Sequence, residues 1–338
     1  MNDRLEWLDE LRGIAALSVM FIHYDHLLRS LESRPFLIES LARGVQLFYV
    51  LSGYILYKLY SMQIGDWTAY RRFIVRRFFR VAPLFYFMTL IGLVVPYQEV
   101  PDPIINSVLH FLILPFGFFP KYIGSMIGIE WSIYVECWFY ALFPLIVASY
   151  KRNPAAALGI ASAISLAQSA AVFMAGSDVA MRTYYYLQPT TQLMFFMLGI
   201  ALADRAQHGS AKRVSPVWFY LGILATLIAP YLVRSSTVQV YLSAISLALM
   251  VASYSSVPRP AWLRSLLLWV GTRSYSLYLI HLPLLMLTDF FFPSRGTGVV
   301  VWGAQVLLAL SIAAMSWKLV EAPGIAFGRR LLSSSASR

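Results

Sequence analysis

An arginine and a histidine, Arg12 and His23, lie eleven residues apart near the beginning of the chain. In an α-helix, at about 100° per residue, eleven steps end within about 20° of the starting direction, so the two side chains would share a face. A rise of about 1.5 Å per residue separates them by roughly 16 Å along the axis. An arginine side chain can bind an anionic group of a donor, and a histidine can act as a general base near neutral pH. The alternative is a structural ion pair, for which Asp9 stands one turn before Arg12, together with an interfacial histidine.

Two further arginines, Arg77 and Arg80, close a run of five arginines within residues 71–80. Three residues apart, they would lie on one helix face, and guanidinium forks fit the geometry of phosphate groups. The alternative is a set of basic anchors that fix the topology and contact lipid headgroups.

A polar stripe runs through the aromatic segment 130–140, where Ser132, Glu136 and Tyr140 recur every four residues. A carboxylate within such a helix needs a partner. Glu136 could orient or charge-stabilise His23, as carboxylates do in catalytic triads. The alternative is a buried salt bridge from Glu136 to an arginine such as Arg80.

A second polar stripe, formed by Ser274, Tyr278 and His281, follows the spacing i, i+4, i+7. These residues could support a site or supply hydrogen bonds between helices. Together with Asp9 and Ser132, Tyr278 and His281 are predicted to contact substrate or to support the residues that do. The sequence shows no zinc-ligand spacing, glycine-rich phosphate loop or nucleophile elbow, so we predict no metal site.

The elements that must position these residues are predicted to be transmembrane helices. Hydrophobic residues make up 59% of the 338, against about 45–50% in soluble proteins. They are gathered into runs near the roughly 20 residues that cross a bilayer. We predict an all-α bundle of ten spans: 11–29, 44–62, 75–97, 130–149, 154–175, 188–206, 214–233, 236–254, 270–291 and 298–320. The segment 103–120, interrupted by three prolines, is predicted to be interfacial or re-entrant, an eleventh span being the alternative.

The charges test this count by the positive-inside rule. With both termini in the cytoplasm, ten spans place 20 of the 27 Lys and Arg residues on the cytoplasmic side and 7 on the far side. Arg12, Arg77 and Arg80 fall on the cytoplasmic side, and Arg43 and Arg182 on the far side. Topology and lipid headgroups thus account for the net charge of +11, and we expect no nucleic-acid partner, because no basic soluble domain is predicted. The single cysteine, Cys137, cannot form an internal disulfide.

Six blocks in order resemble the acyltransferase 3 family of bacterial membrane acyltransferases. They are LDELRGIAAL (8–17) running to His23, FYVLSGY (48–54), RRFFRVAP (76–83), WSIYVE (131–136) with 139–140, SYSLYLIH (274–281), and 316–323 with 328–330. The chain departs from the family at Glu10, where glycine is common, and we expect this to affect packing more than chemistry.

The resemblance implies a ten-span fold that takes acyl-CoA, with acetyl-CoA expected first, as co-substrate on the cytoplasmic side. It implies transfer of the acyl group to a hydroxyl of a cell-surface or lipid-linked glycan, in the bacterial inner membrane. The family patterns fall on Arg12 and His23, and on Arg77 and Arg80. We expect an acyltransferase domain over 1–325, a short cytoplasmic tail over 326–338, and the stand-alone type without a fused soluble domain.

We therefore interpret the chain as an acyl-CoA-dependent O-acyltransferase, with His23 and Glu136 as catalytic residues and Arg12, Arg77 and Arg80 as the donor-binding residues. Direct transfer and an acyl-His23 intermediate both remain open. The rival function is a transporter or flippase of a polar lipid-linked sugar, which would also need buried charges. Acceptor, acyl chain length and oligomeric state stay open.

Overall fold

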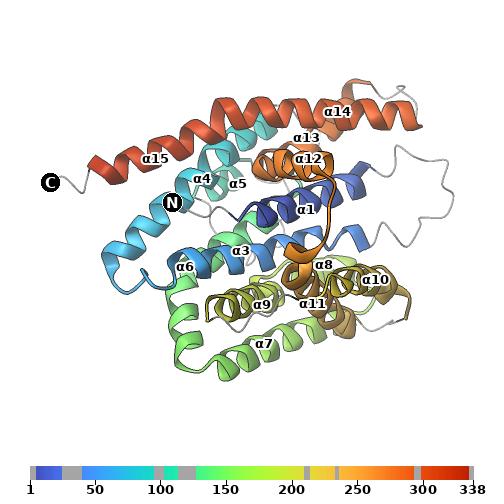
Figure 1. Ribbon diagram of the computed structural model, residues 1–338. Coiled ribbons are helices and arrows are strands. Elements are labelled where there is room, and N and C mark those ends of the chain that lie inside the picture. Colours follow the sequence, from blue (N-terminus) through green and yellow to red (C-terminus); the bar gives the residue numbers. More distant parts are fainter. Residues whose placement is uncertain are drawn as a thin grey trace. The chain divides into compact units, whose positions relative to one another are not determined.

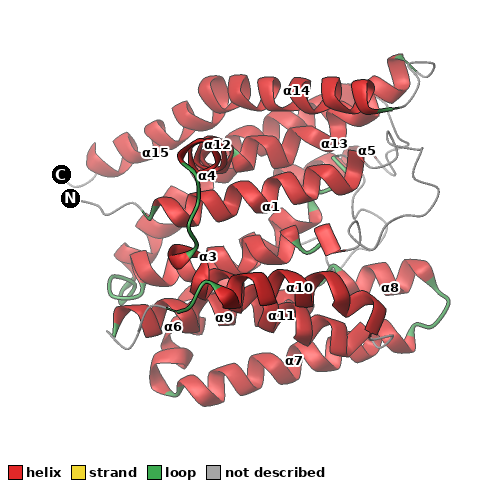
Figure 2. Cartoon of the chain, turned by 45° about the vertical axis from the view of Figure 1, so that its right-hand side comes forward, coloured by secondary structure: helices red, strands yellow, loops and turns green. Residues whose placement is uncertain are grey.

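The computed structural model describes residues 5–24, 40–94, 103–112, 127–208, 214–232, 236–292 and 298–334. These residues are helical with short connections, and no strand occurs among them (Figure 2). Each of the ten predicted spans overlaps a helix. In chain order these are α1 (Glu6–Tyr24), α3 (Gly44–Tyr60), α4 (Trp67–Val94), α6 (Trp131–Arg152), α7 (Pro154–Met174), α9 (Pro189–Gln207), α10 (Val217–Leu232), α11 (Ser236–Ser253), α13 (Ser274–Phe291) and α14 (Val299–Ser316).

Other short helices join them: α5 (Pro103–Phe111), α8 (Val179–Tyr186), α12 (Ala261–Thr272) and α15 (Ala322–Ser334). Helix α5 occupies the start of the proline-broken segment 103–120, whose remainder from 113 lies outside the described residues, as does the end of the first predicted span after Tyr24. Helix α15 covers most of the predicted tail.

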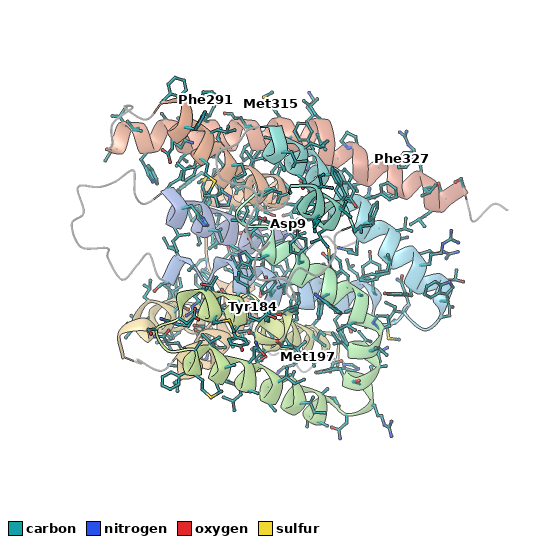
Figure 3. All side chains as sticks on the ribbon, turned by 180° about the vertical axis from the view of Figure 1, so that it is seen from behind. Asp9, Tyr184, Met197, Phe291, Met315 and Phe327 are labelled. Atoms are coloured by element: carbon teal, nitrogen blue, oxygen red, sulfur yellow. The ribbon has the colours of Figure 1, made fainter. Side chains whose placement is uncertain are left out.

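Five helical stretches of the described chain are long and apolar enough to cross a membrane: Trp131–Arg152, Pro154–Met174, Val238–Ser256, Ser274–Phe291 and Val299–Ser334. Large apolar side chains are also exposed on them. Phe291, Met315 and Phe327, labelled in Figure 3, are 62%, 59% and 56% exposed. Apolar surface of this extent is unfavourable in water and favourable against lipid tails. The protein is thus an integral membrane protein, while the number of spans and the side of the termini stay predictions.

The described residues group into two compact units. The first is drawn from 1–22, 31–61 and 145–274, and the second from 23–30, 62–144 and 275–338.

The first unit is built around the close crossing of α3 and α9, which lie side by side (Figure 1). A Cβ atom on Gly53 would overlap the carbonyl oxygen of Phe196, and one on Gly199 would overlap that of Val50. Such contact between backbones is what small residues allow in membrane helices. The rings of Tyr49 and Phe196 stack beside the crossing at 4.7 Å between centroids.

The same unit holds Glu10, the position that departs from the family. Its carboxylate is fully buried and pairs with Arg259 at 2.8 Å. The hydroxyl of Tyr254 donates to it at 3.2 Å, and Arg264 lies 3.5 Å away. Glu10 therefore joins α1 to the segment around α12, which agrees with a packing role.

The second unit packs α4 against α15. A five-residue π-helical turn, Trp317–Glu321, links α14 to α15 and brings the Glu321 carboxylate inward, where it is 2% exposed. Ser276 of α13 donates to that carboxylate at 2.6 Å, and Tyr275 donates to the Val81 carbonyl at 2.7 Å. Helix α13 is thereby held at two successive residues.

The α3–α9 crossing predicts a strong dependence of stability on Gly199. In Gly199→Ala the added methyl group must separate two backbones, so we expect a loss of about 1–3 kcal/mol, the usual range for overpacking. The matched control is Gly159→Ala in α7, where a Cβ meets nothing within 4 Å; there we expect no loss, because alanine favours helix. Thermal unfolding of the purified variants in detergent measures both. Equal midpoints for the two variants would contradict the close crossing.

Candidate active site

Two histidines from opposite ends of the sequence form a pair in the second unit. Nδ1 of His23, one residue before the end of α1, lies 3.1 Å from Nε2 of His281 in α13. The ring centroids are 5.0 Å apart, with the planes inclined by 53°. His281 is completely buried, and His23 is half-buried. His281 is therefore suited to hold His23, and His23 to meet a substrate.

The hydrogen bonds of His281 fix which nitrogen of each ring carries a proton. Nδ1 of His281 lies 3.1 Å from the Leu277 carbonyl, which can only accept, so this nitrogen donates. In a neutral ring Nε2 is then the acceptor. Nδ1 of His23 must donate to it, which makes Nε2 of His23 the basic nitrogen. A fixed tautomer of this kind is what a histidine acting as general base requires.

Two tyrosines, Tyr24 and Tyr278, lie beside His281. The hydroxyl of Tyr24 donates to the His281 carbonyl at 3.0 Å. The ring of Tyr278 lies 5.8 Å from that of His281, and its hydroxyl is 2.6 Å from Oγ of Ser132. Ser132 in turn donates to the Ile129 carbonyl at 3.2 Å. Of the four predicted supporting residues, the structure thus gathers Ser132, Tyr278 and His281 into one cluster with His23.

Glu136 belongs to a second cluster of the same unit. The Tyr140 hydroxyl donates to its carboxylate at 2.5 Å. The guanidinium of Arg77 lies 5.9 Å from the Tyr140 ring and 5.8 Å from that of Phe73. The predicted partnership of Glu136 with His23 stays a prediction, as does the alternative salt bridge to Arg80.

Arg12 lies in the first unit, in an ion pair with Asp9 at 3.8 Å. The predicted pairing of these two residues is thus present. Helix α1 runs without a break through both Arg12 and His23, as the argument from spacing requires. Arg77 and Arg80 both lie in α4, within one turn of each other and half-buried. The described residues contain no group of three or more His, Cys, Asp or Glu that could hold a metal ion.

Tyr24, a member of the site, and Glu130, a buried acid beside Ile129 in the sequence, were not predicted from the sequence. Tyr24 carries no motif, and its role is visible only when α1 meets α13. Glu130 is completely buried at the beginning of α6, where its carbonyl accepts from the amides of Ile133 and Tyr134. Its carboxylate stands where the helix dipole favours negative charge. Its position directly before a helical, aromatic-rich run was the available signal.

The arrangement offers a general base in a largely buried surrounding. His23 can take a proton at its Nε2, and Nε2 of His281 keeps the ring oriented by accepting from Nδ1 of His23. A nucleophilic histidine would need the same geometry. Hydroxyl activation and acyl transfer are therefore both within its chemistry.

Comparison with known proteins agrees with this chemistry. The family model described as "Acyltransferase domain" matches residues 5–318. Peptidoglycan O-acetyltransferase OatA of Listeria monocytogenes is 24% identical, over 94% of this chain and 56% of that protein. O-acetyltransferase OatA of Staphylococcus aureus is 25% identical, over 94% and 57%. The chain thus spans little more than half the length of these curated relatives. No solved structure matches it significantly. With nearly its whole length matched, the chain belongs to the acyltransferase 3 family.

Proposed function

We propose that this protein transfers an acyl group, acetyl first of all, from acyl-CoA on the cytoplasmic side of a bacterial inner membrane to a hydroxyl of a cell-surface or lipid-linked glycan. The observation that carries the proposal is the pair of His23 and His281, which leaves Nε2 of His23 as the basic nitrogen. Similarity to relatives named as O-acetyltransferases, one of them as acting on peptidoglycan, supports the reaction type and the glycan acceptor.

In the proposed reaction, Nε2 of His23 removes the proton of the acceptor hydroxyl. The oxygen attacks the thioester carbonyl, so that a C–O bond forms and the C–S bond breaks. The CoA sulfur leaves with the electron pair of that bond and takes the proton from the His23 imidazolium. His281 accepts a hydrogen bond from Nδ1 of His23 throughout, which keeps the ring oriented.

The donor is proposed to be held by arginines. Arg77 and Arg80, one turn apart on α4, suit the phosphates of CoA. The family pattern also assigns Arg12, which pairs with Asp9, to donor binding. Arg12 lies in α1, and Arg77 and Arg80 lie in α4. The predicted topology places all three on the cytoplasmic side.

Replacement of His23 tests the base. We expect His23→Ala to lower the turnover by about 10²–10⁴-fold, the usual contribution of a general base. The measurement is labelled ester formed from radiolabelled acetyl-CoA and peptidoglycan fragments by purified protein in lipid. His208→Ala, at an exposed histidine, is the control and should retain full activity. Full transfer by His23→Ala would remove His23 from the mechanism. Saturable glycan flux without any labelled product would support a transporter instead.

His281 is predicted to be a positioning residue. His281→Phe removes the acceptor for Nδ1 of His23, so we expect a large fall in kcat with an unchanged KM for acetyl-CoA. His281→Gln offers an amide oxygen as acceptor and should restore part of the lost kcat. Steady-state kinetics of both variants, together with their unfolding midpoints, show whether His281 positions His23 or serves packing. Equal losses in the two variants would mean that His281 serves packing alone.

The donor-binding arginines can be tested with a truncated donor. S-acetylpantetheine carries the thioester but none of the nucleotide phosphates of acetyl-CoA. Charge-assisted hydrogen bonds contribute about 1.5–3 kcal/mol, so Arg80→Gln or Arg12→Gln should raise KM for acetyl-CoA by about 10-fold or more. The same variants should leave KM for S-acetylpantetheine unchanged.

The control for charge alone is Arg329→Gln, at an exposed position of α15. Its kinetics with both donors should match those of the unaltered protein. Equal effects of Arg80→Gln or Arg12→Gln on the two donors would show that these arginines do not bind the phosphates.

A further inference from the structure

The first unit contains a cavity of about 370 Å³ that the proposed reaction does not use. Two arginines reach into it from separate elements: Arg43 immediately before α3, and Arg182 in α8. Hydroxyl and amide groups complete much of its lining, among them Thr183, Tyr186 and Gln239. The volume falls within the range of about 300–1,000 Å³ typical of small-ligand sites.

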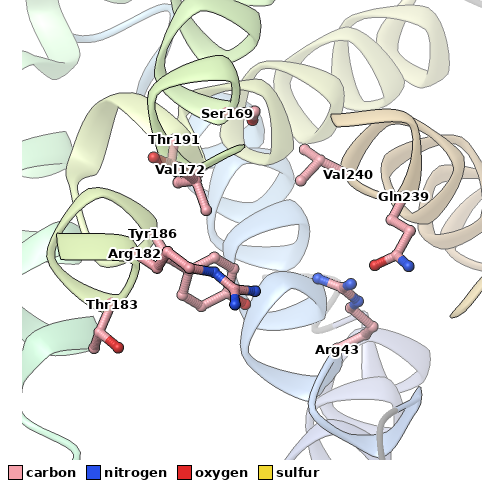
Figure 4. Close-up of a pocket in the computed structure, with 9 residues that line it drawn as sticks. All are labelled: Arg43, Ser169, Val172, Arg182, Thr183, Tyr186, Thr191, Gln239 and Val240. Carbon is pink, nitrogen blue, oxygen red and sulfur yellow. The ribbon is translucent and has the colours of Figure 1, made fainter. Parts of the chain in front are cut away.

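The two guanidinium groups point toward one another across the cavity (Figure 4). Arg43 is half-buried and Arg182 is exposed, and like charges that face each other repel unless an anion lies between them. The described lining residues include no carboxylate. Asp178, the nearest acidic residue along the chain to Arg182, instead caps α8 by accepting from the Met181 amide at 3.0 Å. The electrostatics of the cavity therefore favour an anionic occupant.

A buried hydrogen-bond network fixes one wall of this cavity. Nε2 of Gln46 donates to the Tyr186 hydroxyl at 2.7 Å and lies 3.2 Å from Oε1 of Gln192. Gln192 donates to the Tyr186 carbonyl at 2.8 Å. Both glutamines are at most 1% exposed. Tyr186 is thus held in place before any ligand arrives, as a binding site requires.

The predicted topology adds an independent argument. It places Arg43 and Arg182 among the 7 basic residues on the far side, against 20 on the cytoplasmic side. The positive-inside rule makes arginine uncommon on that side. Two of those seven converge on a single cavity, which favours a binding role over a role in topology.

We propose that this cavity binds an acidic saccharide through its phosphate or carboxylate group, and that this saccharide is the glycan acceptor. Arg43 and Arg182 clamp the anion, while Tyr186, Thr183 and Gln239 contact sugar hydroxyls. The identification of the saccharide as acceptor rests on the proposed function, whereas the binding of an acidic saccharide in the cavity does not.

The first test measures binding to the full chain in phosphatidylcholine nanodiscs by calorimetry. The probes are N-acetylmuramic acid and N-acetylglucosamine, which differ by a carboxylate-bearing group. We expect the acidic sugar to bind at least about 10-fold more tightly than the neutral one. The double variant Arg43→Gln/Arg182→Gln should abolish this preference, Arg182→Lys should keep part of it, and the exposed Arg152→Gln should leave it unchanged.

Equal binding of the two sugars, or a retained preference in the double variant, would overturn the proposal. Nanodiscs that contain phosphatidylglycerol provide a second arm. If this lipid is retained through Arg43 and Arg182 while the acidic sugar fails to bind, the occupant is a lipid headgroup and the proposal is wrong.

Activity measurements separate this proposal from the proposed function. The double variant should raise KM for an acidic acceptor and leave KM for acetyl-CoA unchanged. If the acidic sugar binds through the two arginines but no acetyl group is transferred, the cavity proposal stands and the proposed enzymatic activity is refuted. If transfer depends on His23 but the double variant has the same KM for the acceptor, the proposed activity stands and the cavity is not the acceptor site.

Discussion

The structure depends on one constraint: a polar group buried in a membrane protein must find its partner within the protein. Helix α13 shows how this constraint is met. Ser276 donates to Glu321, Tyr278 is bonded to Ser132, and His281 uses both ring nitrogens, one toward Leu277 and one toward His23. Because every one of these bonds has a direction, satisfying them also orients His23. The same bonds therefore stabilise the second unit and prepare its chemistry.

Polar bonds alone do not hold membrane helices in register, because little hydrophobic force acts between helices in lipid. In the first unit the close approach at Gly53 and Gly199 supplies van der Waals contact over the α3–α9 crossing. Gln46 on α3 and Gln192 on α9 both bond to Tyr186, which lines the cavity. A small change in the crossing would thus reach the cavity through both glutamines.

The sequence predicted local features well. Ten apolar runs overlap ten helices, and Asp9 pairs with Arg12. It did not predict the contact of His23 with His281, because 258 residues separate them and periodicity carries no information on which helices meet. It also assigned Arg43 and Arg182 to topology and lipid headgroups, since a charge count does not reveal that the two arginines face one cavity.

The histidine pair and the arginine cavity differ in what satisfies their polar groups. At the histidines, named protein groups satisfy the ring nitrogens of His281, so the tautomer of His23 is settled before a substrate binds. In the cavity, the guanidinium groups of Arg43 and Arg182 face each other, and the described lining residues include no carboxylate. The first arrangement suits a residue whose protonation must be defined, and the second suits recognition, since the missing partner has to come from the ligand. Polar groups whose partners the protein supplies are thus suited to reaction, and those whose partners must come from a ligand are suited to binding.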